Sequence, residues 1–310
     1  MRQVLVDLWG FKLHAYATML SLSFVLGTLL AVREGDKRGM WLAPEGGLWI
    51  FFGALLGAKV FWYLQFDPTW YTHPWRMLLI WNPGVVYYGG LIGGVVAGWL
   101  YTTIQEFPRL KTADVVVPYL ALGQAITRVG CFLNGCCFGK PSDVPWAVQF
   151  PKGGHAWMRQ EMDKLLNASD SSVTRSLPVH PTQLYMVAGL VVMVVVLKWA
   201  LSRKRFDGQV GLLYLFFYGL LRFVVEFYRG DSVRSVFGMT VSQALSLGMV
   251  LVAVVLLGIA WKRGLWHRRP VPAGGDGPQG EASSHDEPEA PAAASAERDP
   301  GDEGGPGQDG

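Results

Sequence analysis

Apolar residues gather in seven long runs, and this pattern limits the chain to a small set of folds. A helix needs roughly 20 predominantly apolar residues to cross the hydrocarbon core of a bilayer. The fourth run is the weakest, because Arg128 lies inside it. The sequence therefore predicts an all-α, polytopic membrane protein with seven transmembrane helices. These cover about residues 13–32, 48–66, 84–104, 113–134, 181–200, 209–228 and 240–261.

The composition agrees with a membrane protein. Only 16% of the 310 residues are charged, whereas a soluble domain usually has about a quarter. The formal charge of +3 is small, and no basic patch is interleaved with aromatic residues, so a nucleic-acid partner is not expected. No small-residue cleavage site follows the first apolar run, which we interpret as a retained helix and not a removed signal peptide.

Basic residues are unequally divided between the two sets of short connections, which predicts the orientation. Cytoplasmic connections are enriched in Lys and Arg. One set holds only Arg76, Arg229 and Arg234. With seven spans, the N-terminus is expected outside and the C-terminus in the cytoplasm. The basic set holds Arg33, Lys37, Arg38, Arg109, Lys111, Lys198, Arg203, Lys204, Arg205, Lys262, Arg263, Arg268 and Arg269.

Two polar regions interrupt or follow the helices. On this topology, about residues 137–179 form an extracytoplasmic insertion that is long enough for a small cap. From about residue 269 to 310 the chain is rich in Pro, Gly, Ala and acidic residues, with few bulky apolar ones. Such a composition cannot bury enough surface to offset chain entropy. We expect a catalytic membrane domain over residues 1–268 and a disordered cytoplasmic tail over residues 269–310.

The sixth apolar run carries a row of polar side chains, Tyr218, Arg222, Glu226 and Arg229. Their spacings of four, four and three residues place them on one face of a helix. An Arg–Glu pair at this spacing can be a purely structural ion pair. The second arginine and the tyrosine favour a binding surface, because guanidinium groups offer a planar set of donors that suits phosphate.

Further polar or glycine positions lie near the expected outer ends of other runs. Arg128, Asn134 and Gly139 surround the end of the fourth run, where glycines suggest a turning backbone or close approach to a ligand. The alternative is a helix end with an arginine that extends to the interface. Tyr16 and Tyr88 start the first and third runs, where interfacial tyrosines are common.

Two further motifs have ordinary structural interpretations. Thr182 and Gln183 open the fifth run, where helix capping is the default role. Metal ligation, redox chemistry and apolar filling are all open to the cysteines. No matching His or Cys pair occurs elsewhere, so a zinc site is poorly supported and filling is favoured. The chain has three cysteines, Cys131, Cys136 and Cys137.

Several motifs together resemble the prolipoprotein diacylglyceryl transferase family. They are VYYGGLIGG, TRVGCFLNGCCFGKPSD, HPTQLY and YGLLRFVVEFYRGD, in that order, and the similarity covers most of residues 10–262. The resemblance implies transfer of the diacylglyceryl group of phosphatidylglycerol to the lipobox cysteine of a prolipoprotein. It also implies a seven-helix protein of the bacterial cytoplasmic (inner) membrane, with no metal or soluble cofactor.

The resemblance assigns roles residue by residue. Arg128 corresponds to the arginine of the family signature, and Arg222 to the essential arginine of the sixth span. The other matching positions, expected to bind substrate, are Tyr16, Asn134, Gly139, Tyr218, Glu226 and Arg229. Some members have a histidine base where this chain has Tyr88, and Asn and Glu where it has Cys131 and Cys136. The base is therefore left to Tyr88, which needs a lowered pKa or an already ionised thiol.

Two other classes of protein fit parts of the pattern. A membrane thiol oxidoreductase would use Cys136 and Cys137. A transporter would use the charged residues within the helices as a substrate path. Neither class explains why arginines from two different apolar runs gather at one membrane face.

Overall fold

The computed structural model describes residues 4–8, 11–67, 71–73, 75, 84, 86–163, 165, 172–231, 234–236 and 238–267. Within them, seven helices have 18 residues or more. These are α1 (Ala15–Asp36), α2 (Glu45–Phe66), α3 (Tyr87–Ile104), α4 (Arg109–Asn134), α6 (Thr182–Ser202), α7 (Gln209–Glu226) and α8 (Val241–Lys262). Each coincides with one of the seven predicted runs.

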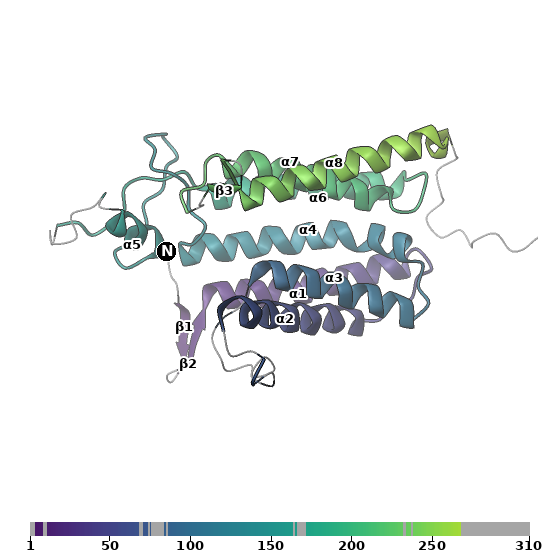
Figure 1. Cartoon of the computed structure of the whole chain (residues 1–310), viewed down its shortest axis with the longest axis horizontal. Coiled ribbons are helices and arrows are strands. Elements are labelled where there is room, and N and C mark those ends of the chain that lie inside the picture. The colour runs from purple at the N-terminus through teal and green to yellow at the C-terminus, as the bar shows by residue number, and fades with distance from the viewer. Residues whose placement is uncertain are drawn as a thin grey trace, which may run out of the picture. The chain divides into compact units, whose positions relative to one another are not determined.

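Helix α4 lies at the centre of the bundle. Figure 1 shows α1, α2 and α3 on one side of it and α6, α7 and α8 on the other. Helix α4 packs against α1, α6 and α7, whereas α2 packs mainly on α3, and α8 mainly on α7. Buried apolar side chains of α4, such as Val115 and Ala125, share a core with Met186, Leu190 and Leu197 of α6. Residues on α4 can therefore reach groups from both halves of the bundle.

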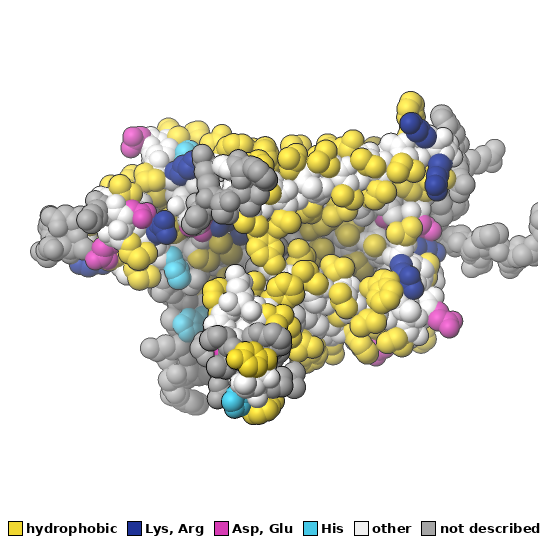
Figure 2. All heavy atoms as spheres, in the orientation of Figure 1, with side chains coloured by type: hydrophobic (Ala, Val, Ile, Leu, Met, Phe, Trp, Pro, Cys, Tyr) yellow, Lys and Arg dark blue, Asp and Glu magenta, His cyan; other side chains and the backbone are white. Residues whose placement is uncertain are grey.

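The outer surface of the bundle is apolar. Figure 2 shows hydrophobic side chains along the helices, with most charged ones toward the two ends. Six of the described helices, all the long ones except α3, are long and apolar enough to cross a membrane. Helix α3 contains five glycines and three tyrosines in its 18 residues, which lower its hydropathy. These findings agree with the prediction of a mainly helical, multi-pass membrane protein.

Small residues bring α2 and α3 into backbone contact. A Cβ atom on Gly57 would meet the Gly89 carbonyl oxygen and lie 2.8 Å from the Gly93 Cα atom. Gly53 likewise lies against the Gly93 backbone. Because helices in lipid associate through close packing and not through a hydrophobic driving force, such contacts are an efficient way to join them.

A buried ion pair secures the end of the bundle that contains the α6–α7 connection. The Lys204 ammonium lies 2.9 Å from the Asp114 carboxylate, and both side chains are almost fully buried. Asp114 also accepts hydrogen bonds from the backbone N–H groups of Gly208 (2.8 Å) and Gly211 (3.0 Å). Breaking a buried pair of this kind by removing one partner typically costs about 3–5 kcal/mol. The start of α4 is thus tied to the α6–α7 turn.

Two pairs of short strands accompany the helices of this all-α bundle. An antiparallel pair, β1 (Val4–Leu8) and β2 (Phe11–His14), precedes α1. A second pair, β3 (Arg234–Val236) and β4 (Met239–Thr240), leads into α8. A short 3₁₀ turn (Leu265–His267) follows α8.

In its described residues, the predicted insertion over residues 137–179 has one short helix, α5 (His155–Met162), together with isolated β-bridges. Its small core consists of Phe138, Phe150, Ala156 and Val179. The predicted tail, residues 269–310, lies outside the described residues. All described residues belong to one compact unit, Met1–Gly275.

The α2–α3 contact gives a first prediction. We expect Gly57→Ala to lower the melting temperature of the purified protein, because its Cβ atom meets backbone that must move. Overpacking of this kind typically costs about 1–3 kcal/mol. The matched control is Gly98→Ala on α3, where the nearest neighbour of a Cβ atom is a side-chain carbon at 3.6 Å. Equal melting temperatures for the two variants in thermal unfolding would contradict the close packing of these helices.

Candidate active site

The chain turns sharply where α4 ends, and this turn starts the site. The backbone N–H groups of Gly135 and Cys136 bond back to the carbonyls of Phe132 (3.2 Å) and Cys131 (3.1 Å). This is a Schellman motif, which satisfies the last carbonyls of a helix. Gly135 has φ = 76°, a left-handed conformation that suits glycine. After the turn, the chain runs toward the start of α6 and the end of α7.

The segment 138–140 is held between the residues before α6 and those after α7. Backbone hydrogen bonds connect it to both sides at 2.8–3.1 Å. We call this arrangement the clasp. Its bonds run from Gly139 N–H to His180 O, from His180 N–H to Lys140 O, from Lys140 N–H to Tyr228 O, and from Gly230 N–H to Phe138 O.

Gly139 has a packing reason to be glycine. A Cβ atom there would lie 2.5 Å from the His180 Cβ atom and 2.9 Å from the Tyr228 carbonyl oxygen. The sequence pattern allows either a turning backbone or close approach to a ligand at this position. In the structure, the space beside Gly139 is filled by the chain itself.

Thr182 and Gln183 do not cap α6, contrary to the default interpretation. The residue before the helix is Pro181, and no side chain caps the first turn. The Thr182 hydroxyl donates to the Cys137 carbonyl and the Gln183 amide donates to the Cys136 carbonyl, each at 2.7 Å. Cys137 has φ = 61°, which is uncommon for a residue with a side chain. The two donors therefore hold the turn after α4, residues 135–137, in a strained conformation. We call this segment the signature turn.

Arg222 is oriented by two polar neighbours. One of its terminal nitrogens lies 2.8 Å from the Glu226 carboxylate, and the other donates to the Ser242 hydroxyl at 3.0 Å. Glu226 is buried and accepts a hydrogen bond from the Thr240 hydroxyl at 2.9 Å. Thr240 is the N-cap residue of α8 and forms a capping box with Gln243. The start of α8 thus fixes the ion pair of α7.

Arg229 is not on the helical face that the sequence spacing predicted. Helix α7 ends at Glu226, and Arg229 lies three residues further on, where its backbone pairs with Gly139 in an antiparallel bridge. Its guanidinium group forms two hydrogen bonds of 2.7 Å with Asp231. Burial alone would lower the pKa of Arg229, but Cys137 and Asp231 raise it above its usual value. The side chain stays cationic.

Three arginines nevertheless gather at this end of the bundle. Arg222 lies close enough to Arg229 and Arg128 for their charges to interact, and Arg229 also interacts with Arg128. Tyr218 faces Arg222 from the preceding turn of α7 and stacks on Tyr214, with ring centroids 5.6 Å apart. The positive charges come from α4, from α7 and from the segment after α7. Such a cluster suits an anionic ligand, phosphate above all.

Tyr16 and Asn134 lie at the edge of this cluster. Tyr16 is 37% exposed and interacts electrostatically with Arg128 and the cysteines. Its helix comes close because Gly130 leaves room for Met19, which a Cβ atom would approach to 2.8 Å. Asn134, in the last turn of α4, neighbours Cys136.

Tyr88 lies on α3 and not on a helix that carries one of the three arginines. It lies half-buried in the first turn of α3, and α3 packs mainly on α2. The start of α3 and the end of α4 are at the same end of the bundle, because consecutive long helices alternate in direction (Figure 1).

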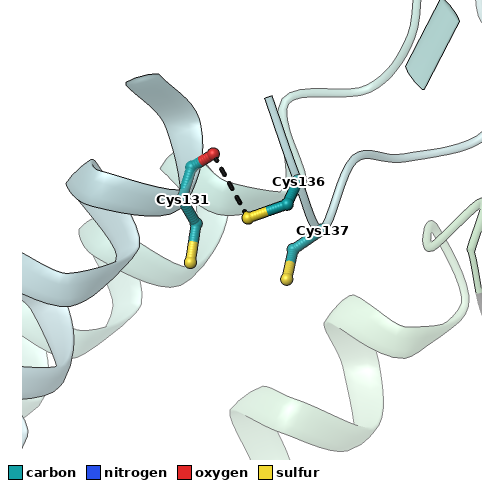
Figure 3. A group of neighbouring side chains, drawn as sticks. All are labelled: Cys131, Cys136 and Cys137. Atoms are coloured by element: carbon teal, nitrogen blue, oxygen red, sulfur yellow. Dashed lines mark hydrogen bonds between the residues drawn. The ribbon is translucent and has the colours of Figure 1, made fainter. Parts of the chain in front are cut away.

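The three cysteines form a compact group (Figure 3). Their sulfur atoms all lie within 4.8 Å of one another. Cys131 is buried in the last turn of α4, and Cys136 and Cys137 follow the turn. The Cys136 thiol donates weakly to the Cys131 carbonyl, with sulfur and oxygen 3.7 Å apart. The end of α4 and the turn after it bring these three thiols together.

An aromatic and hydrogen-bonded group beside the clasp was missed as a site feature. The Tyr185 hydroxyl lies 3.1 Å from His180 Nδ1 and accepts from the Trp146 indole at 2.7 Å. The Tyr228 ring packs edge-on against His180, with centroids 5.2 Å apart. His180 and Tyr185 belong to the HPTQLY motif and Tyr228 to YGLLRFVVEFYRGD, but the sequence gives no sign that these motifs and Trp146 meet.

Bundle and site together define a multi-pass membrane protein with a cationic site at one end of its helices. The sequence model of the family described as prolipoprotein diacylglyceryl transferase matches residues 3–259. The chain therefore belongs to this family, whose members are transferases.

Individual relatives match over most of their length. A phosphatidylglycerol–prolipoprotein diacylglyceryl transferase from Clostridium tetani is 30% identical, over 84% of this chain and 98% of the relative. One from Pasteurella multocida is 31% identical, over 84% of this chain and 92% of the relative. One from Cupriavidus pinatubonensis is 32% identical, over 72% and 76% respectively.

The hydrogen bond from Thr182 to the signature turn gives a second prediction. Thr182→Val keeps the shape but leaves the Cys137 carbonyl without this donor, which typically costs about 1–3 kcal/mol. We expect a lower melting temperature and faster proteolysis within residues 137–179. Thr18→Val is the matched control, because the Thr18 hydroxyl bonds only locally, to the His14 carbonyl, and is exposed. A variant at 182 that melts like the control would show that the turn does not depend on this bond.

Proposed function

We propose that this chain transfers the diacylglyceryl group of phosphatidylglycerol to the lipobox cysteine of prolipoproteins. A thioether forms and glycerol 1-phosphate leaves, which is the first step of lipoprotein maturation. The observation that carries the proposal beyond family membership is the group of three mutually interacting arginines beside the signature turn. A phospholipid head group is anionic, and the group of arginines provides the complementary charge.

The reaction is a displacement at the glyceryl carbon that is bonded to a phosphate oxygen. The nucleophile is the thiol sulfur of the prolipoprotein substrate. As the carbon–oxygen bond breaks, negative charge develops on the leaving glycerol phosphate. Preorganised donors near such a charge lower the barrier because they need not reorient during the reaction. Arg222 and Arg128 take this role.

The remaining site residues position the substrates. Glu226 holds Arg222 through their ion pair, and Thr240 holds Glu226. Tyr16 and Asn134 orient oxygens of the lipid head group. The other residues assigned to substrate binding are Tyr218, Gly139 and Arg229, with Gly139 acting through the clasp. Tyr88 is the candidate acceptor of the thiol proton among the protein's own side chains, in the position where some relatives have histidine.

The membrane arrangement follows from the same proposal. All seven long helices cross the bacterial inner membrane, including the glycine-rich α3. The N-terminus and the insertion over residues 137–179 are outside, and the C-terminal segment 269–310 is a cytoplasmic tail. An exported prolipoprotein would present its lipobox cysteine on the outer side, where this topology places the end of α4. The basic connections at the opposite end support this orientation.

The arginine assignment gives a third prediction. Arg222→Ala and Arg128→Ala should each reduce diacylglyceryl transfer roughly 10²- to 10³-fold, as for other preorganised donors. The measurement is turnover of a lipobox peptide by the purified variants. Arg203→Ala is the matched control, since Arg203 lies at the opposite end of the bundle, over the Trp199 ring. Near-normal transfer by both site variants would contradict the scheme.

The role of Glu226 gives a fourth prediction. Glu226→Gln removes the charge that orients Arg222, and small misplacements of positioning groups can cost up to about 10²-fold in rate. We expect kcat to fall while the KM for phosphatidylglycerol changes little. Thr240→Val should act in the same direction more weakly. If kcat falls in both variants only in proportion to the loss of melting temperature, the two residues have a structural role instead.

The reaction itself is tested by mass spectrometry. A lipobox peptide incubated with the purified protein and phosphatidylglycerol should gain the mass of a diacylglyceryl group, with release of glycerol phosphate. A peptide with Ser in place of the lipobox Cys is the control and should remain unchanged. An unmodified Cys peptide, with enzyme that remains folded, would overturn the proposed function.

A further inference from the structure

The facing sides of α4 and α7 carry polar and aromatic side chains further into the bundle than the arginines. On α7 these are Tyr214 and Tyr218, which precede Arg222 at spacings of four residues and share its helical face. On α4, Gln124 precedes Arg128 at the same spacing. The two helices pack on each other, and both end at the arginine cluster. The polar surface of the site therefore continues inward from the arginines.

Gln124 is joined to α7 by one hydrogen bond. The Tyr214 hydroxyl donates to the side-chain oxygen of Gln124 at 3.1 Å. The Tyr214 ring is itself held by stacking on Tyr218, with the ring planes 14° apart. Tyr218 interacts in turn with Arg222. Because the oxygen of the Gln124 amide is fixed toward Tyr214, its NH₂ group is turned to the other side.

This NH₂ group is a donor that the protein itself does not use. The Gln124 side chain is half-buried, and its nitrogen forms no hydrogen bond with the described part of the chain. An amide that lacks a partner in a membrane interior costs free energy. Two apolar side chains could join α4 to α7 without that cost. A purely structural role therefore leaves the amide nitrogen unexplained.

The position of Gln124 along α4 indicates what its amide could bind. Four helical residues correspond to roughly 6 Å, so Gln124 lies about one turn further from the site end than Arg128. In a phospholipid whose phosphate binds the arginines, the ester carbonyls lie roughly 5–7 Å from phosphorus at ordinary bond lengths. The acyl chains beyond them have no hydrogen-bond acceptor. The ester carbonyls are thus the acceptors that such a lipid offers at the depth of Gln124.

We propose that Gln124, oriented by Tyr214, donates a hydrogen bond to an ester carbonyl of the diacylglyceryl group. This inference rests on the proposed function and deepens it. The arginines hold the phosphate and Gln124 holds an ester, so the glyceryl carbon under attack is fixed between two contacts. Gln124 is then a specificity-determining residue. It favours ester-linked over ether-linked glycerolipids, because an ether has no carbonyl oxygen to accept the amide N–H.

A matched pair of lipids tests the inference. Diacyl phosphatidylglycerol is compared with a dialkyl analogue of equal chain length, which keeps the phosphate and both glycerols but lacks the two carbonyls. The measurement is kcat/KM for modification of a lipobox peptide by the full chain in detergent, followed by mass spectrometry. We expect the wild-type chain to favour the diacyl lipid roughly 5- to 20-fold, as for loss of one hydrogen bond. Equal kcat/KM values would overturn the inference.

Variants separate recognition of the ester from a structural role. Gln124→Leu cannot donate, so the ratio of diacyl to dialkyl kcat/KM should fall to about one. Tyr214→Phe keeps the stacked ring but lets the amide turn, so an intermediate ratio is expected. Thr127→Val is the matched control and should keep the wild-type ratio, because the Thr127 hydroxyl joins α4 to Ser23 of α1 at 3.0 Å. If Gln124→Leu loses rate equally with both lipids, its defect is structural and the inference is overturned.

The same preparations distinguish a failure of this inference from a failure of the proposed function. If both lipids support transfer equally well, the function stands and the inference fails. If neither lipid supports transfer, the function fails, and stabilisation by lipid decides whether the ester is recognised. The diacyl lipid should raise the melting temperature of the wild-type chain more than the dialkyl analogue, and Gln124→Leu should remove this difference. Equal stabilisation of the wild-type chain by both lipids would overturn the inference.

Discussion

The site depends on the backbone hydrogen bonds that hold residues 138–140 between α6 and α7. They join parts of the chain that are separated by about 40 to 90 residues, and they bring the end of central helix α4 against the end of α7. Together with the direct packing of α4 on α7, they hold Arg128 and Arg222 at the same end of the bundle. Gly139 permits this approach, and Thr182 and Gln183 continue it by binding the next two carbonyls along the turn. The positions of the arginines and the strained backbone of Cys137 both depend on this end of the bundle.

Fixed carboxylates explain how like charges can gather in the bundle. Three interacting arginines repel one another, and burial raises the cost. The chain offsets this with carboxylates that are themselves fixed, Glu226 by Thr240 and Asp231 by a two-bond contact with Arg229. An anionic substrate would add further compensation, so its binding would reduce the electrostatic repulsion among the arginines. That is the arrangement expected when a phosphate leaving group must be stabilised.

The helices could be predicted from the sequence because the bilayer imposes one length and one composition on each of them. Helix α3 was found by the same pattern although glycines weaken its hydropathy. Arg222 and Glu226 could be predicted as a pair, because a four-residue spacing is local. Arg229 could not be placed, since the helical repeat gives no sign that α7 stops at Glu226. The roles of Thr182 and Gln183, and the meeting of the three thiols, depend on contacts between distant segments that periodicity does not contain.

Helix α8 has a position with a consequence for the whole enzyme. It packs mainly on α7 and exposes most of its apolar side chains, yet its first residues hold Glu226 and Arg222 through Thr240 and Ser242. A helix that tilts to match the thickness of the bilayer moves its ends most. A change in bilayer thickness that tilts α8 would therefore shift Thr240 and Ser242, and with them the positions of Glu226 and Arg222.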